Sequence, residues 1–80
     1  MDPPEDALTT AERHVREGKA RVVRQLAIIE EMDRDNRPAA AATAREVLTT
    51  LRATLDLMRG HLRMEREARG LAVWASQRHG

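Results

Sequence analysis

Small and apolar residues, with Gln25 and Glu65 as exceptions, recur along this chain at alternating intervals of three and four, and the pattern is interrupted only once. Such spacing places side chains in one stripe along an α-helix, which is the seam that a coiled coil buries. The sequence therefore predicts two helices, each with a single stripe to cover. The first series comprises Leu8, Ala11, Val15, Gly18, Val22, Gln25, Ile29 and Met32, and the second comprises Ala44, Leu48, Leu51, Leu55, Met58, Leu62 and Glu65.

The interruption at residues 35–37 is predicted to be a turn. Asn36 favours a turn, and Pro38 suits the first turn of a following helix. Short connections join helices that lie antiparallel. We therefore expect an all-α fold, an antiparallel two-helix hairpin that resembles a coiled coil, with helices at about 10–34 and about 38–69.

Folding back at Asn36 fixes a register between the two stripes. Residues whose numbers add up to about 73 are expected to lie opposite each other, so that Val22 faces Leu51 and Gly18 faces Leu55. A glycine in the middle of a helix destabilises it by roughly 1 kcal/mol relative to alanine. We interpret Gly18 as a point where the two helices approach closely; a tolerated defect is the alternative.

The ends of the chain are expected to be less ordered than its middle. Residues 1–8 are rich in proline and acidic residues, and we expect them to be disordered. Thr9 is the expected N-cap of the first helix, and Glu12 completes the spacing of a capping box. Gly70 is expected to end or kink the second helix, which leaves residues 70–80 as a frayed helix or a flexible tail.

The composition argues against several kinds of protein. The chain has 80 residues, enough for one small domain, and no cysteine for a disulfide or a thiolate metal site. Its net charge is +1 and Trp74 is its only aromatic residue, so neither a strong field nor a base-stacking surface favours nucleic acid. No apolar run reaches the ~18 residues of a membrane span, and the acidic N-terminus does not resemble a signal peptide. We expect a cytoplasmic protein that does not contact membranes.

A further apolar row lies outside the two predicted stripes. Leu57, Met64 and Leu71 repeat at intervals of seven, which places them in one line on the second helix. A two-helix hairpin buries only one stripe per helix and is marginally stable alone. The row is therefore predicted to mediate self-association, most simply as a homodimer that forms a four-helix bundle. A helix from an unknown protein partner and a stable monomer are the alternatives.

Arginines form a second candidate surface. Arg45, Arg52, Arg59 and Arg66 also repeat every seven residues along the second helix. Such a stripe favours an anionic partner, either nucleic acid or an acidic protein. The alternative interpretation is a solvated flank whose arginines pair with carboxylates. The residues of the predicted interaction surface are thus Leu57, Met64, Leu71, Arg52, Arg59 and Arg66.

Two histidines are the remaining candidates for chemistry. The predicted register places His14 and His61 on the same edge of the hairpin, where they could bind a metal or sense pH. Two exposed polar residues beside the core are the simpler interpretation. The sequence has no Glu-x-x-His pair, His-Glu-x-x-His motif or glycine-rich phosphate loop. We therefore assign no catalytic, cofactor or metal site and do not expect an enzyme.

Three stretches carry a resemblance to other proteins: Ala11–Gly18, Ile28–Glu30 and Thr49–Leu62. In these stretches the chain resembles a group of short helical-hairpin proteins from alphaproteobacteria, especially rhizobia-like bacteria. That group has no established activity, so the resemblance implies a hairpin and assigns no functional residue. Its turn often has a Gly-His-Asp-like segment, where this chain has residues 35–38 in the order Asp-Asn-Arg-Pro.

These patterns together favour a small non-catalytic protein–protein interaction module or regulator that self-associates through its helix faces. The alternative function is a nucleic-acid-associated regulator that uses the arginine stripe. Neither a cofactor nor a particular partner is indicated by the residues.

Overall fold

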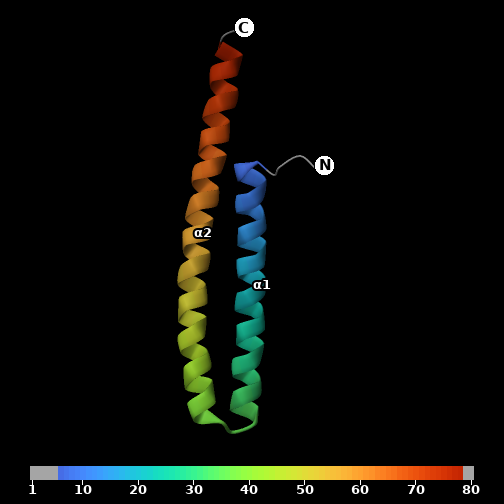
Figure 1. Ribbon diagram of the computed structural model, residues 1–80, viewed down its shortest axis with the longest axis vertical. Helices are drawn as coiled ribbons and strands as arrows, with labels where there is room; N and C mark the ends of the chain where they lie inside the picture. The colour runs from blue at the N-terminus through green and yellow to red at the C-terminus, as the bar shows by residue number, and fades with distance from the viewer. Residues whose placement is uncertain (1–5, 79–80) are drawn as a thin grey trace.

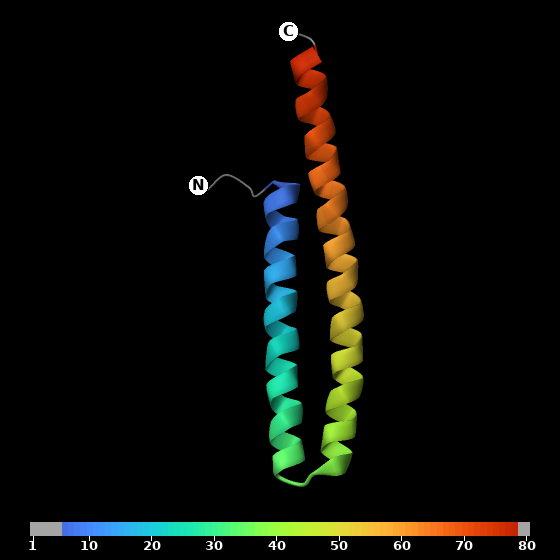
Figure 2. The same ribbon diagram turned by 180° about the vertical axis from the view of Figure 1, so that it is seen from behind.

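The computed structural model describes residues 6–78, which form two antiparallel helices joined by a short turn (Figure 1). Helix α1 spans Ala7–Arg34 and helix α2 spans Pro38–Arg78. The helices lie side by side, as the view from behind also shows (Figure 2), in a body with extents of 66 × 29 × 13 Å. The expected all-α antiparallel hairpin is therefore confirmed.

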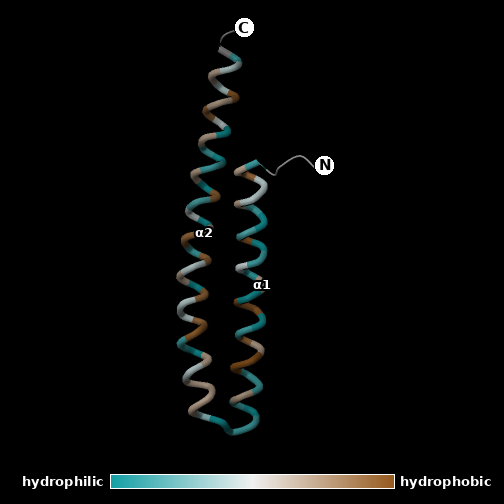
Figure 3. Tube along the Cα trace, in the orientation of Figure 1, coloured by the Kyte–Doolittle hydropathy of each residue, from teal (hydrophilic) through white to brown (hydrophobic). Residues whose placement is uncertain are grey.

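The core lies between the two predicted stripes, and every member of both series is buried or half-buried. Hydrophobic residues recur along both helices in the tube view (Figure 3). The buried side chains form two clusters, and Val22 packs against both of them. Three of the eight buried hydrophobic residues are alanines, so the core is narrow. Its members are Ala11, Val15, Ile29, Ala41, Ala44, Leu48, Leu55 and Leu62.

The predicted register is confirmed where Gly18 meets Leu55. A Cβ atom added to Gly18 would lie 3.0 Å from Leu55 Cδ1 and 3.2 Å from Met58 Sδ. Both distances are short for carbon and sulfur contacts, so the missing side chain allows the helices to approach closely here. The close-packing interpretation of Gly18 therefore holds. Further along, the Gln25 side chain Nε2 donates a 2.8 Å hydrogen bond to the Ala44 carbonyl oxygen.

The first helix begins earlier than expected, because its N-cap is Asp6 and not Thr9. Asp6 Oδ1 accepts a 2.7 Å hydrogen bond from the backbone N–H of Thr9, which lies in the first turn of α1. An earlier start also lets Leu8 become half-buried against the core. Residues 6–8 were expected in the disordered segment; instead Asp6 caps the helix, and Ala7 and Leu8 begin it. Residues 1–5 of that segment lie outside the described residues.

The turn between the helices is closed by backbone hydrogen bonds. Asn36 has a φ of 54°, in the left-handed region that asparagine tolerates better than most residues. The Arg37 N–H then donates a 2.9 Å hydrogen bond to the Met32 carbonyl oxygen. This geometry reverses the chain over residues 35–37, so that Pro38 begins α2.

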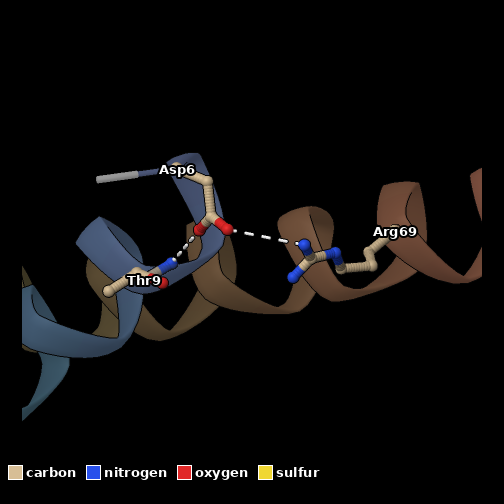
Figure 4. Close-up of polar contacts among 3 residues, drawn as sticks. All are labelled: Asp6, Thr9 and Arg69. Carbon is tan, nitrogen blue, oxygen red and sulfur yellow. Dashed lines mark hydrogen bonds and ion pairs between the residues drawn. The ribbon is translucent and has the colours of Figure 1, made fainter. Parts of the chain in front are cut away.

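The second helix does not end near residue 69 but continues through Gly70 to Arg78. A glycine weakens a helix by roughly 1 kcal/mol without ending it, and no proline follows Gly70. Arg69 lies level with the start of α1, since its Nη2 is 3.4 Å from Asp6 Oδ2 (Figure 4). Beyond that level α2 projects past α1 (Figure 1). We call residues 70–78 of α2 the overhang; residues 79–80 lie outside the described residues.

Candidate interaction surfaces

The apolar row predicted outside the stripes lies on the side of α2 that faces away from α1. We call Leu57, Met64 and Leu71 the outer row. Their exposed fractions are 76%, 65% and 67%, which are high for large hydrophobic residues. Leu57 is two residues from the buried Leu55, and two residues turn a helix by roughly 200°. The outer row is therefore nearly opposite the face that α1 covers.

The outer row reaches the overhang, where Trp74 extends it. Trp74 is 55% exposed and lies three residues after Leu71, on the next turn of α2. A shallow depression beside it is lined by Glu67, Gly70, Leu71 and Trp74. Because Gly70 has no side chain, the surface is open at this point: no atom would lie within 4 Å of a Cβ added there.

Two of the four arginines in the predicted stripe form ion pairs with carboxylates. Arg45, near the turn, forms a 2.7 Å ion pair with Asp33 of α1. Arg59 lies 3.7 Å from Asp56 on its own helix, and both side chains are exposed. Arg52 is exposed between them. The interpretation as a flank whose arginines pair with carboxylates therefore holds for Arg45 and Arg59. The C-terminal half of the stripe also lines a groove.

A groove with a volume of about 360 Å³ lies along one edge of the hairpin. Its floor is formed by Val15 and Leu62, both buried core residues. We call it the basic groove, because five of its eight lining residues are cationic. The lining residues are Glu12, Val15, Arg16, Lys19, Arg59, Leu62, Arg63 and Arg66.

The contribution of α1 to the basic groove was missed by the sequence analysis. Arg16 and Lys19 were not predicted to belong to a surface, although the register that pairs Gly18 with Leu55 also brings Arg16 near the level of Arg59. The signal was therefore present, but it required combining the arginine stripe with the predicted register.

The two candidate histidines, His14 and His61, are both exposed. His61 Nε2 lies 3.6 Å from Glu65 Oε1, one turn along the same helix. Among the described residues, no hydrogen bond or ion pair joins His61 to His14. Within residues 6–78 there is also no group of three or more His, Asp or Glu side chains that could hold a metal ion.

The fold places this chain in the class of two-helix hairpins. No protein-family model matches it, and neither a curated protein nor a solved structure matches it. In the part of the chain that the structure describes, neither helix is long and apolar enough to cross a membrane.

Proposed function

We propose that this chain is a small non-catalytic interaction module that self-associates as a homodimer through the outer row. Because the outer row lies nearly opposite the face that α1 covers, the two α2 helices pair at the centre of this dimer and one α1 lies on each outer side, so that the four helices lie in a row rather than as a four-helix bundle around a common core. The observation that carries this proposal is the exposure of the outer row together with Trp74. Single exposed apolar residues are ordinary on protein surfaces, but several large ones aligned along one face of a helix favour an interaction site. The narrow core of the hairpin adds a reason, because a second apolar interface would supply stability that one stripe does not.

A second copy of the chain fits the outer face because that face has the spacing of another coiled-coil seam. Residues on this face recur at intervals of four and three, as they do on the covered face. A seam of this kind is suited to pairing with a helix of the same spacing. The outer seam comprises Ala53, Leu57, Gly60, Met64, Glu67, Leu71 and Trp74.

An antiparallel arrangement centred on Met64 matches large residues with small ones. Met64 then meets Met64 of the second copy, and Leu57 lies opposite Leu71. Trp74 lies opposite Ala53, so that the largest side chain of the seam meets a small one. Burying these apolar side chains is worth roughly 25 cal/mol per Å² removed from water.

The charged member of the outer seam supports the same arrangement. Glu67 would lie opposite Gly60 of the second copy, which leaves space for it, and within one turn of Arg63. A parallel arrangement would instead place Glu67 beside Glu67, and like charges in a seam are unfavourable. The antiparallel dimer is therefore the arrangement that we propose.

Disulfide crosslinking of single-cysteine variants tests this geometry, because the natural chain has no cysteine. We expect Met64→Cys to form a crosslinked dimer readily. Leu57→Cys is expected to crosslink with Leu71→Cys in a mixture of the two variants but slowly with itself. Val23→Cys, at an exposed position on α1, is the control and should crosslink slowly. Rapid self-crosslinking of Leu57→Cys would contradict the antiparallel arrangement.

The oligomeric state tests the proposal independently of geometry. By sedimentation equilibrium, the natural chain should have twice the 9.0 kDa mass of one copy. The double variant Leu57→Glu with Met64→Glu should have the mass of one copy, because charge in an apolar interface opposes association. Ala20→Glu with Ala27→Glu adds the same charge at exposed positions of α1 and should remain a dimer. A natural chain that is folded and monomeric at high micromolar concentration would refute the proposal.

A further inference from the structure

The basic groove gathers positive charge from both helices into one place. Arg16 and Lys19 line it from α1, and three arginines line it from α2. Among its lining residues the only carboxylate is that of Glu12. The net charge of the whole chain is only +1, so this concentration of charge is local and not a property of the whole surface.

Most of these cations have no carboxylate partner in the described part of the chain. Within residues 6–78, no ion pair of 4.0 Å or less involves Arg16, Lys19, Arg63 or Arg66. Arg45, in the same stripe, is paired with Asp33 at 2.7 Å. The four cations without a carboxylate partner repel each other across the groove, and a bound anion would relieve that repulsion.

The shape of the groove favours a small ligand that is held by charge. Its floor is closed by Val15 and Leu62, which are buried and therefore offer little apolar surface. Its volume of about 360 Å³ lies in the range of small-molecule sites. The cations contributed by α2 extend from Arg59 to Arg66, a distance of roughly 10 Å along the helix.

We infer that the basic groove binds a compact, multiply charged phosphate anion, such as a linear oligophosphate. Guanidinium groups donate paired hydrogen bonds to phosphate oxygens, and four of the five cations are arginines. Nucleic acid is disfavoured as the ligand because the lining residues include no aromatic side chain on which a base could stack. A long nucleic-acid strand would also need unpaired arginines along the whole stripe, but Arg45, near the turn, is paired with Asp33.

Titration of the full chain with inorganic tripolyphosphate at low salt tests this inference. By calorimetry we expect saturable binding, and by NMR we expect shifts concentrated in residues 12–19 and 59–66. The double variant Arg59→Glu with Arg63→Glu should bind at least ~10-fold more weakly. Arg24→Glu with Arg37→Glu makes the same change in net charge at exposed positions away from the groove and should stay within about threefold of the natural chain.

A second variant tests the site in the opposite direction. Glu12→Gln removes the groove's carboxylate and should strengthen tripolyphosphate binding about twofold to fivefold at low salt. A variant that merely damaged the fold would not bind more tightly. The site is also separable from self-association, because the Leu57→Glu, Met64→Glu variant leaves every lining residue in place and should still bind.

Three results would overturn the inference. The first is no saturable binding at millimolar tripolyphosphate. The second is an equal loss in both charge-reversal double variants, which would indicate a general charge effect. The third is binding of a 20-nucleotide single strand more than ~10-fold more tightly than tripolyphosphate at equal phosphate concentration, which would make nucleic acid the ligand.

Discussion

Two rows of apolar side chains run along α2 with the same spacing and have opposite surroundings. The inner row, Leu48, Leu55 and Leu62, is 8%, 5% and 7% exposed, because α1 covers it. The outer row repeats at the same interval of seven and is mostly exposed. Spacing therefore predicts that a row will lie on one line of a helix, but it does not predict what covers that line.

The two rows differ in exposure because α1 has only one apolar stripe and can cover only one of them. Helix α1 has one continuous stripe, and pairing it with the inner row buries Val15 and Ile29 together with the leucines. No third helix exists in the described chain to cover the outer row. The inner row is thus expected to determine the stability of the hairpin, and the outer row its association.

Truncating one residue of each row should give the largest contrast. Leu55→Ala is expected to destabilise the hairpin by about 2–5 kcal/mol, because it leaves a cavity where Gly18 lets the helices approach closely. Leu57→Ala, compared with Leu55→Ala in the same Met64→Glu background so that charge opposes self-association in both, should change the free energy of unfolding by less than about 0.5 kcal/mol. Urea unfolding followed by circular dichroism measures both. Equal losses would show that the rows do not differ in the way we describe.

The glycines of the two regions should respond to alanine with opposite signs. Gly18→Ala is expected to destabilise the hairpin by about 1 kcal/mol, because displacing Leu55 and Met58 outweighs the better helix propensity of alanine. Gly70→Ala meets no atom within 4 Å and should instead raise the helicity of the overhang. Thermal melts and the helical signal at low temperature separate the two effects. Stabilisation by Gly18→Ala would mean that the helices approach less tightly than the structure indicates.

The smallest expected change in stability concerns Asp6, which caps α1 and pairs with Arg69. This pair lies where the covered part of α2 ends. The hydrogen bond from the Thr9 backbone N–H lowers the pKa of Asp6 below its usual value, and the Thr9 hydroxyl and the Arg69 charge act in the same direction. A lowered pKa means that the ionised carboxylate stabilises the folded chain. This stabilisation is complete above the pKa of Asp6 in the unfolded chain and is lost as pH falls through the folded value.

We therefore expect Asp6→Ala to lower the melting temperature slightly at neutral pH and to remove part of its fall in acid. Asp6→Asn is the matched control, because asparagine also caps helices but does not titrate in this range. It should keep most of the stability at neutral pH and share the weaker dependence on acid. Identical pH profiles for the natural chain and both variants would contradict the role of this carboxylate.

The hairpin, its stripes and its register were predictable because helix geometry fixes which residues share a face. The start of α1 was not, since Asp6 and Thr9 can both cap a helix and the two positions differ by less than one turn. The sequence left residues 70–80 open between a frayed helix and a tail, because Gly70 weakens a helix without stopping it; residues 70–78 are helical. The basic groove needs side chains from both helices, so the arginine stripe of α2 indicated only Arg59 and Arg66 among its lining residues.

Hydrogen exchange in the overhang should report whether a molecule is bound there. The backbone amides of the overhang lie in a helix that α1 does not cover, so their hydrogens should exchange with deuterated solvent much faster than those near Leu55. An isolated helix this short is held together weakly in water. Any molecule that docks on Leu71 and Trp74 would slow that exchange over a few consecutive amides, without altering the rates in the middle of the hairpin.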